Sequence, residues 1–400
     1  MLELTGYIHR TELKDIMTRW LLGRFEPEDC PRLKDIVNFN GHFVSRYLND
    51  TCQRLFSWLA VDGVSRVPVQ QKGDLKDFVV RNPPYGNRRI DEMLAHYARY
   101  PQDYYRRAPF LGVLYYSGTL DAPRYLGHSR IKRARRLSEK GARRIVDFIF
   151  AHIKNQADLL AEERACRLGI SKSQLITDPQ TQLEEFVHAE RRVLKAIRLG
   201  TLPQAPGATT LLPINDVAGV KVILENDRAH LLGEFIAANP DLRTVETEEH
   251  SGAYNATNLI LEITLDKEAL ALPPPPEVKE VFAERGLEAD GIDERYREFV
   301  LGGEDTARLE VIVSNYGDLL ESELGRCMHE DRILAQRSIQ DYRSSLAFNV
   351  RYLIEYLFLF TMSPAKSVCE VPFVLWEHNM PDTFDEAVKR LWNHRYLPAI

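Results

Sequence analysis

The sequence predicts an α+β fold, in which a mixed β-sheet of about five strands is flanked by helices, with large helical insertions and a helical C-terminal region. Between Ile214 and Ser314, apolar strand-like runs follow the order strand, helix, strand, strand, strand. Long helical patterns precede and follow this block, over about residues 138–199 and 319–361. A strand-rich centre between helical segments is typical of a sheet with helices on its faces.

The same patterns divide the chain into three parts. Residues 1–120 are mixed, with amphipathic helices between turn-rich stretches, and their role is left open. The core is expected over residues 121–335, with helical insertions at about 145–200 and about 268–303. Residues 336–400 are expected to form the C-terminal helical region.

Each strand of the core has its own signal. The run VAGVKVILE is apolar almost throughout. Two further strands are expected in ANPDLRTVETEEHSGAYNATNLILEITLD, on either side of a turn at Ser251 and Gly252. The run ARLEVIVSN then brings the chain back to the sheet after the second helical insertion.

Composition is that of an ordinary globular protein, with 44% apolar and 28% charged residues and a formal net charge of -6. This balance gives no global reason to expect nucleic-acid or membrane binding, so such a role must come from local patches. Five cysteines are scattered and form no CxxC pair, which indicates reduced thiols in a cytoplasmic protein without a zinc site. They are Cys30, Cys52, Cys166, Cys327 and Cys369.

The most hydrophobic run, Ser345 to Met362, predicts a buried helix of a soluble core. Arg351 and Glu355 lie inside it, and two charged side chains argue against a membrane span. The N-terminal segment lacks the apolar stretch of a signal peptide. No membrane partner is therefore expected.

A strongly basic segment runs from His128 to Arg144. It contains one acid, Glu139, and eight basic residues: Arg130, Lys132, Arg133, Arg135, Arg136, Lys140, Arg143 and Arg144. Positive charge concentrated in an acidic protein indicates an anionic partner, and polyphosphate or RNA bound through residues 130–144 are the candidates. The alternative is a solvated helix face whose charges pair with acids elsewhere.

Two acids, Asp216 and Glu310, each lie at one end of an apolar strand. If the sheet brings them together, they could bind Mg²⁺, which keeps several waters and takes further ligands from substrate phosphates. Taken singly, each is more often a cap or a turn former. The sequence alone does not establish their pairing.

Aromatic residues supply a third candidate surface. Tyr254 begins a strand after the turn at Gly252, where its ring could stack on a base. The tyrosine-rich stretch HYARYPQDYYRRAPFLGVLYY offers further rings. Such rings are equally consistent with the edge of a core.

The order of these pieces resembles the synthetase domain of RelA/SpoT-type alarmone synthetases, which transfer pyrophosphate from ATP to the 3′ hydroxyl of a guanine nucleotide. The resemblance covers roughly residues 124–335 and implies a nucleotidyltransferase-like fold. In that family an R-x-K segment, with a Lys eight residues on, grips the ATP phosphates. Arg130, Lys132 and Lys140 have this spacing.

The family's strand motifs match in part. DVAGVK resembles D-[IVL]-x-G-x-R, which implies that Asp216 binds Mg²⁺ and Lys221 binds phosphate. EVIVS resembles the strand that supplies the second metal carboxylate, here Glu310, which is also the candidate base for the acceptor hydroxyl. By the same resemblance, the acceptor would contact three further residues: Tyr254, Glu262 and His329.

Departures from the family pattern are concentrated on the acceptor side. Asn255, Ala256 and Asn258 replace the Arg, Ser and His of the family, and Met328 replaces the Glu before the His. Further along, Ile312 and Ser314 replace a Gln and an Arg. These changes predict a different acceptor, such as an adenine nucleotide or an RNA 3′ end, or no acceptor at all.

Two functional hypotheses follow. One is a divergent, Mg²⁺-dependent pyrophosphokinase or nucleotidyltransferase that uses ATP. The other is a catalytically degenerate nucleotide- or RNA-binding protein of the same fold. A chance match within a structural α+β protein is the plainest alternative.

Overall fold

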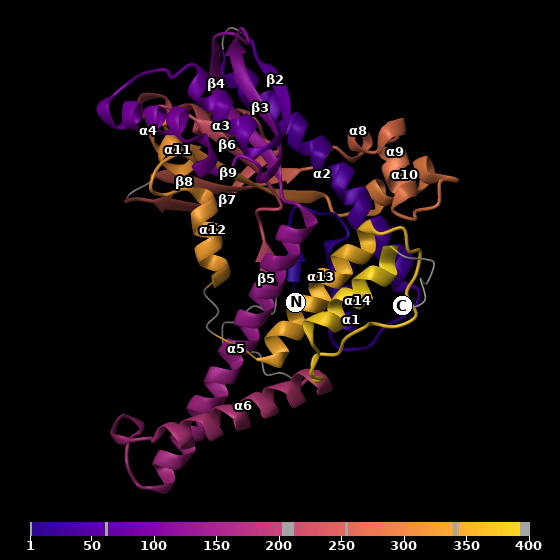
Figure 1. Cartoon of the computed structure of the whole chain (residues 1–400). Helices are drawn as coiled ribbons and strands as arrows, with labels where there is room; N and C mark the ends of the chain where they lie inside the picture. The colour runs from indigo at the N-terminus through magenta and orange to yellow at the C-terminus, as the bar shows by residue number, and fades with distance from the viewer. Residues whose placement is uncertain are drawn as a thin grey trace.

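The computed structural model describes residues 2–60, 63–201, 212–252, 255–338, 342 and 344–392 (Figure 1). Within these residues, a seven-stranded sheet has the order β2-β3-β4-β6-β9-β8-β7. In this order the strands are β2 (Ser65–Gln71), β3 (Pro109–Gly118), β4 (Pro123–Ile131), β6 (Ala218–Ile223), β9 (Thr306–Ser314), β8 (Ala256–Thr264) and β7 (Leu242–His250). Only the pair β6–β9 is parallel among these described strands, so the predicted mixed sheet is confirmed.

The sheet is larger than the about five strands expected from the sequence. Three strands are additional to the four runs named above: β2 and β3, from the first 120 residues, and β4, which overlaps the start of the basic segment and is not among the expected strands. β2 pairs with β3, and β3 pairs with β4. β2 has the sequence SRVPVQQ and is largely exposed, as expected of an edge strand. Its proline and its polar residues hide the strand pattern.

Helices pack on one face of the sheet and form the larger apolar core with it. This core includes α1 (Arg10–Leu21), the long helix α2 (Asp29–Leu59) and α7 (His230–Ala238), which joins β6 to β7. The ring of Phe56 on α2 stacks on Tyr115 of β3, with 4.4 Å between the ring centroids. Alternate residues of β6, such as Val220 and Val222, are fully buried in this core.

A second apolar cluster joins α3 (Lys72–Arg81), α4 (Arg88–Arg99) and α11 (Tyr316–Glu323) to β2, β3 and β4. Three of the six tyrosines of the tyrosine-rich stretch, Tyr97, Tyr104 and Tyr116, are buried in this cluster. Those rings are therefore core residues. Tyr105, which follows the short helix η1 (Pro101–Tyr104), is exposed.

Both expected helical insertions are present. α5 (Ala134–Arg167) and α6 (Pro179–Leu199), with η2 (Lys172–Gln174) between them, form an arm that extends away from the sheet in Figure 1. The second insertion, between β8 and β9, holds three helices: α8 (Lys267–Leu270), α9 (Pro276–Glu284) and α10 (Ile292–Gly302). A short helix, η3 (Asn226–Arg228), precedes α7.

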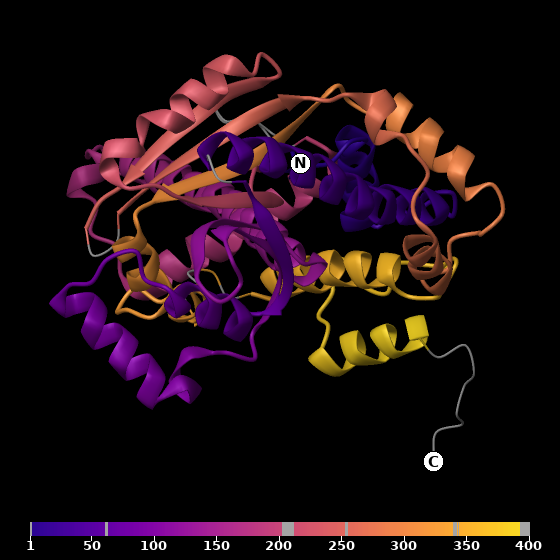
Figure 2. The same cartoon turned by 90° about the horizontal axis from the view of Figure 1, so that it is seen from above.

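The C-terminal part is helical, as predicted. It comprises α12 (His329–Ser338), α13 (Ser345–Met362) and α14 (Pro381–Trp392), and Figure 2 shows α13 and α14 side by side. α13 is buried along most of its length and packs against α2 and α5. Across the described ranges, no helix combines the length and the apolar character that crossing a bilayer requires.

A small separate sheet joins the beginning of the chain to the core. β1 (Leu2–Leu4) pairs in parallel with β5 (Leu212–Ile214). The amide of Thr5 donates to the carbonyl of Ile214 at 3.2 Å, and its hydroxyl donates to the side chain of Asn215 at 2.9 Å. These contacts fix the backbone immediately before Asp216.

Candidate functional site

One face of the sheet forms the floor of a cavity of about 1110 Å³. Two rows of residues cross β4, β6, β9 and β8 in register, two positions apart along each strand, so both rows point to the same face. The first row is Arg130, Gly219 and Glu310. The second row is His128, Lys221, Ile312 and Asn258. Both rows line the cavity.

The cavity is strongly cationic. Among the described residues that line it, twelve are Lys or Arg and six are Asp or Glu, although the whole chain has a formal charge of -6. Seven of the twelve come from the basic segment: Arg130, Lys132, Arg133, Arg136, Lys140, Arg143 and Arg144. A concave surface with excess positive charge concentrates anions. The basic segment is thus the wall of a cavity, and only Arg135 among its basic residues lies outside the lining.

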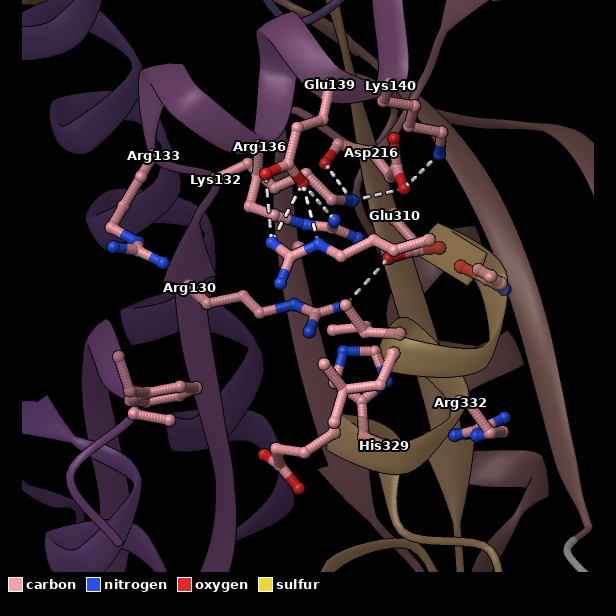
Figure 3. A pocket seen from close by; sticks show the side chains of 18 of the residues that line it. Arg130, Lys132, Arg133, Arg136, Glu139, Lys140, Asp216, Glu310, His329 and Arg332 are labelled. Atoms are coloured by element: carbon pink, nitrogen blue, oxygen red, sulfur yellow. Dashed lines mark hydrogen bonds and ion pairs between the residues drawn. The ribbon is translucent and has the colours of Figure 1, made fainter. Parts of the chain in front are cut away.

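Asp216 lies between two lysines of this wall (Figure 3). Its carboxylate pairs with Lys132 and, at 2.5 Å, with Lys140. Lys132 also donates to the backbone carbonyl of Asp216 at 2.7 Å. Burial alone would raise the pKa of Asp216, but the two ammonium groups outweigh it and hold the pKa well below its usual value. Asp216 is therefore ionised at neutral pH.

Glu310 lies on the neighbouring strand, next to Gly219. Its carboxylate is 3.6 Å from the guanidinium of Arg130. A Cβ atom at position 219 would lie 3.3 Å from Oε2 of Glu310, so glycine keeps the floor open at this carboxylate. Asp216 lies two residues before the first residue of β6 and Glu310 pairs with β6, and both line the same cavity. The sheet therefore brings together the two acids that the sequence singled out.

The second row of the floor holds two groups whose proton affinity is reduced. Burial lowers the pKa of Lys221 to about 8, and its Nζ donates to the hydroxyl of Ser322 at 3.0 Å. Burial also lowers the pKa of His128 well below its usual value, and its Nδ1 lies 2.5 Å from the hydroxyl of Tyr125. The resemblance implies a phosphate-binding role for Lys221, whereas the sequence marks His128 only as the start of the basic segment.

A buried ion cluster, most of which lines the cavity, has almost no signal in the sequence. Lys72 on α3 contacts both carboxylate oxygens of Glu323, at 2.9 and 2.8 Å, and lies 3.2 Å from Glu330. Lys76, which is completely buried, lies 3.3 Å from Glu330 and donates to the carbonyl of Tyr104 at 2.8 Å. These pairs tie α3 to α11 and α12. The one sequence signal is a pair of lysines four residues apart in the run KGDLKDFVV, a spacing that places both on one side of a helix.

α12 forms the wall opposite the basic segment. Its first residue, His329, lines the cavity, and burial lowers its pKa well below the usual value, so the imidazole is neutral at pH 7. Near its other end, Arg337 contacts Glu139 of α5 at 2.9 Å. Between them, Asp331 accepts a hydrogen bond from the hydroxyl of Tyr105 at 2.6 Å. α12 is thus connected to α5 through Arg337 and to Tyr105 through Asp331.

The remaining predicted acceptor residues are placed differently. Glu262 does not line the cavity, and its carboxylate lies 2.6 Å from Arg243 and 3.6 Å from Arg308. Tyr254 lies outside the described residues. His250 and Asn258, which contact each other at 3.0 Å, line the cavity in this region.

The two carboxylates fit Mg²⁺ that arrives with phosphate better than a preformed metal centre. No group of three or more His, Cys, Asp or Glu side chains suited to a metal occurs in the described part of the chain. Mg²⁺ commonly uses one or two carboxylates together with waters and substrate phosphates. Oδ1 of Asp216 is buried and accepts no hydrogen bond from the described residues, so this oxygen is available to a metal ion.

Comparison with protein family models, with curated proteins and with solved structures finds no match for this chain.

Proposed function

We propose that the cavity binds ATP with Mg²⁺ and transfers its pyrophosphate group to a hydroxyl of a nucleotide or of an RNA 3′ end, on a nucleotidyltransferase-like fold. The observation that carries this proposal is the arrangement of Asp216 and Glu310 beside the glycine gap at Gly219, inside a cavity with a large excess of positive charge. Two carboxylates among cations suit a metal-bound polyphosphate.

The cations of the site would bind and orient the polyphosphate. Lys132 and Lys140 are paired with Asp216, and both can exchange this carboxylate for phosphate oxygens when the nucleotide enters. Arg130 and Lys221 lie on the floor of the cavity, where they would offset charge on the leaving nucleoside monophosphate. Bound Mg²⁺, held by Asp216 and Glu310, would supply charge neutralisation at the phosphates.

The reaction requires one proton acceptor. The hydroxyl oxygen of the acceptor forms a bond to the β-phosphorus, and the bond from that phosphorus to the α,β-bridging oxygen breaks. AMP leaves with the electron pair of the broken bond, and the hydroxyl proton passes to the carboxylate of Glu310. Most of the rate enhancement in such transfers comes from positioning and electrostatic stabilisation, which this cationic cavity can supply.

A nucleotide- or RNA-binding protein without transfer is the second candidate. It is favoured by the acceptor side of the site, where Glu262 is engaged by two arginines outside the cavity lining. Small or amide side chains at Ala256 and Asn258 also offer fewer charged contacts to a second nucleotide than the family pattern does.

The test is transfer of label from γ-labelled ATP to GDP, GTP, ADP, ATP or bulk tRNA in the presence of Mg²⁺. We expect a labelled product in the wild type and a loss of about 100-fold or more in Asp216→Asn and Glu310→Gln. Asp241→Asn is the matched control, because Asp241 also precedes a strand and pairs with Arg54 at 2.7 Å but does not line the cavity.

The outcomes separate the two candidates. Tight Mg²⁺-dependent ATP binding without a labelled product would replace the enzyme by the binding protein. Absence of binding of both ATP and tRNA to the wild type would refute both.

A further inference from the structure

One edge of the cavity is apolar, in contrast to its cationic walls. Tyr105, shortly before β3, and Pro109 and Leu111, at the start of this strand, all line the cavity and are all exposed. The exposed fraction is 38% for Tyr105 and 55% for Leu111. Exposed apolar side chains beside a polar cavity are typical of a ligand-binding surface.

Tyr105 is held in an unusual conformation. Its backbone has φ 49° and ψ 33°, in the left-handed region that residues other than glycine rarely adopt. Its hydroxyl donates to Asp331 of α12 at 2.6 Å, so the ring is fixed at both ends. Strained residues of this kind persist where the surroundings fix them, often at binding sites. A ring fixed in this way is pre-organised for stacking.

We propose that this apolar edge, centred on Tyr105, stacks the base of a purine nucleotide whose phosphates lie among the cations of the floor. The inference rests on the proposed function only in that the cavity binds a nucleoside polyphosphate. Gly112 pairs with Arg130 across β3 and β4, and Phe110, which lies two positions from Gly112 and so on the same face, lines the cavity as well. The apolar edge therefore adjoins the cationic floor within one continuous cavity.

The size and chemistry of the cavity favour a base at this edge. A volume of about 1110 Å³ exceeds what a triphosphate group alone would fill. Stacking on an aromatic ring uses the flat face that every base has, and two fused purine rings cover more of it than one pyrimidine ring. Arg133, which also lines the cavity and lies apart from the ion pairs of Asp216 in Figure 3, can add a guanidinium contact to the base.

The test compares the affinities of ATP, GTP, CTP and inorganic tripolyphosphate, measured by calorimetry with Mg²⁺. In the wild type we expect ATP and GTP to bind more tightly than CTP and tripolyphosphate. Tyr105→Ala should weaken ATP binding about tenfold or more and leave tripolyphosphate binding unchanged. Tyr105→Phe, which keeps the ring, should retain most of the ATP affinity.

Controls separate stacking from damage to the fold. Tyr85→Ala removes a ring of similar exposure (37%) outside the cavity lining and should leave ATP affinity unchanged. Tyr105→Gly is a second variant, because glycine suits the left-handed backbone and removes only the side chain. Leu111→Ala should weaken ATP binding, whereas Leu120→Ala, at an equally exposed leucine (55%) outside the lining, should not.

Each outcome bears on a separate claim. Unchanged ATP affinity in Tyr105→Ala and Tyr105→Gly would overturn the stacking role, as would an equal loss for ATP and tripolyphosphate. Tripolyphosphate binding without any gain from a base would also overturn it, while leaving the cavity as a polyphosphate site. Failure of the wild type to bind tripolyphosphate would instead remove the proposed function.

Discussion

Lys132 and Lys221 make the charge of the site dependent on pH near neutrality. The pKa of each is lowered to about 8, chiefly by burial, from an ordinary value of 10.5. A bound phosphate would favour the charged form of both lysines and raise these pKa values. Binding of polyphosphate and uptake of protons are therefore coupled in this cavity.

We predict that polyphosphate binding takes up protons at pH 8 and weakens as the pH rises from 7 to 9.5. Above about pH 8 the free protein has lost protons from Lys132 and Lys221, and binding must restore them. Calorimetry in two buffers of different ionisation enthalpy measures the uptake. Lys132→Met should reduce it, and Lys279→Met, at a lysine paired with Asp293 outside the cavity lining, should not.

The same lysines affect folding stability with the opposite sign. Their pKa values are lower in the folded protein, so between about pH 8 and 10.5 the unfolded chain binds more protons than the folded chain. The contribution of these two groups to the free energy of unfolding therefore increases with pH over that window.

The calorimetric binding experiment also tests the lowered pKa values of both lysines. Absence of proton uptake by the wild type on binding polyphosphate would contradict them.

At the scale of single residues, the sequence was informative where charge stood out against an apolar background. Asp216, Lys221 and Glu310 could be selected because an ionisable residue interrupts or borders an apolar strand. Lys72 and Lys76 could not, because their partners Glu323 and Glu330 are about 250 residues away in the chain. Sequence spacing carries no information on contacts of that range.

Among the elements, the parallel pair β6–β9 determines the geometry of the site. Gly219 and Glu310 are partners in this pair. Gly219 has no side chain that could fill the floor beside the carboxylate. The β6 strand is otherwise fully buried up to Val222, so it cannot shift to make room. The position of the Glu310 carboxylate is thus sensitive to one methyl group.

We predict that Gly219→Ala folds but loses about tenfold or more of its nucleotide-dependent activity. The new Cβ would lie 3.3 Å from Oε2 of Glu310, so the carboxylate has to move away from the position in which the glycine floor leaves it. Activity assays with a thermal unfolding curve check both parts. Gly233→Ala, at an exposed helical glycine with open space around it, should keep full activity and gain about 0.5–1 kcal/mol in stability.

Strands differed in how well the sequence revealed them. β6, β8 and β9 are recognisable as apolar runs, and the turn after β7 is marked by Gly252. β2 and β3 were hidden, because one contains a proline and exposed glutamines and the other lies in a tyrosine-rich stretch that also fits a helix edge. The neighbour relations of the strands depend on long-range pairing and had no local signal.

At the scale of the whole molecule, the first 120 residues belong to the same sheet as the site. β3 pairs with one edge of β4, the strand that carries Arg130. α2 covers the face of the central strands that lies opposite the cavity. No sequence pattern indicates this dependence, since the N-terminal region reads as a separate mixed segment. The core over residues 121–335 therefore relies on elements outside it.

We predict that a fragment of residues 121–335 does not fold on its own. It would expose the edge of β4 and the apolar face that α2 covers in the full chain, which removes a large part of the core. Circular dichroism and thermal unfolding provide the measurement. A cooperative unfolding transition in the fragment would contradict the prediction, and the full chain with residues 171–175 of the arm replaced by Gly and Ser serves as the folded control.

The pairing of β1 with β5 has a consequence for the time course of folding. Thr5 and Asn215, which contact each other next to Asp216, are 210 residues apart in the chain. During synthesis, β1 must wait on the order of ten seconds or more for its partner strand to be made, at ribosomal rates of about 5–20 residues per second. Contacts this distant in sequence also form slowly in refolding. The carboxylate at the centre of the site therefore reaches its place only after more than half of the chain has been made, and a chain that stalls before that step would lack a working cavity.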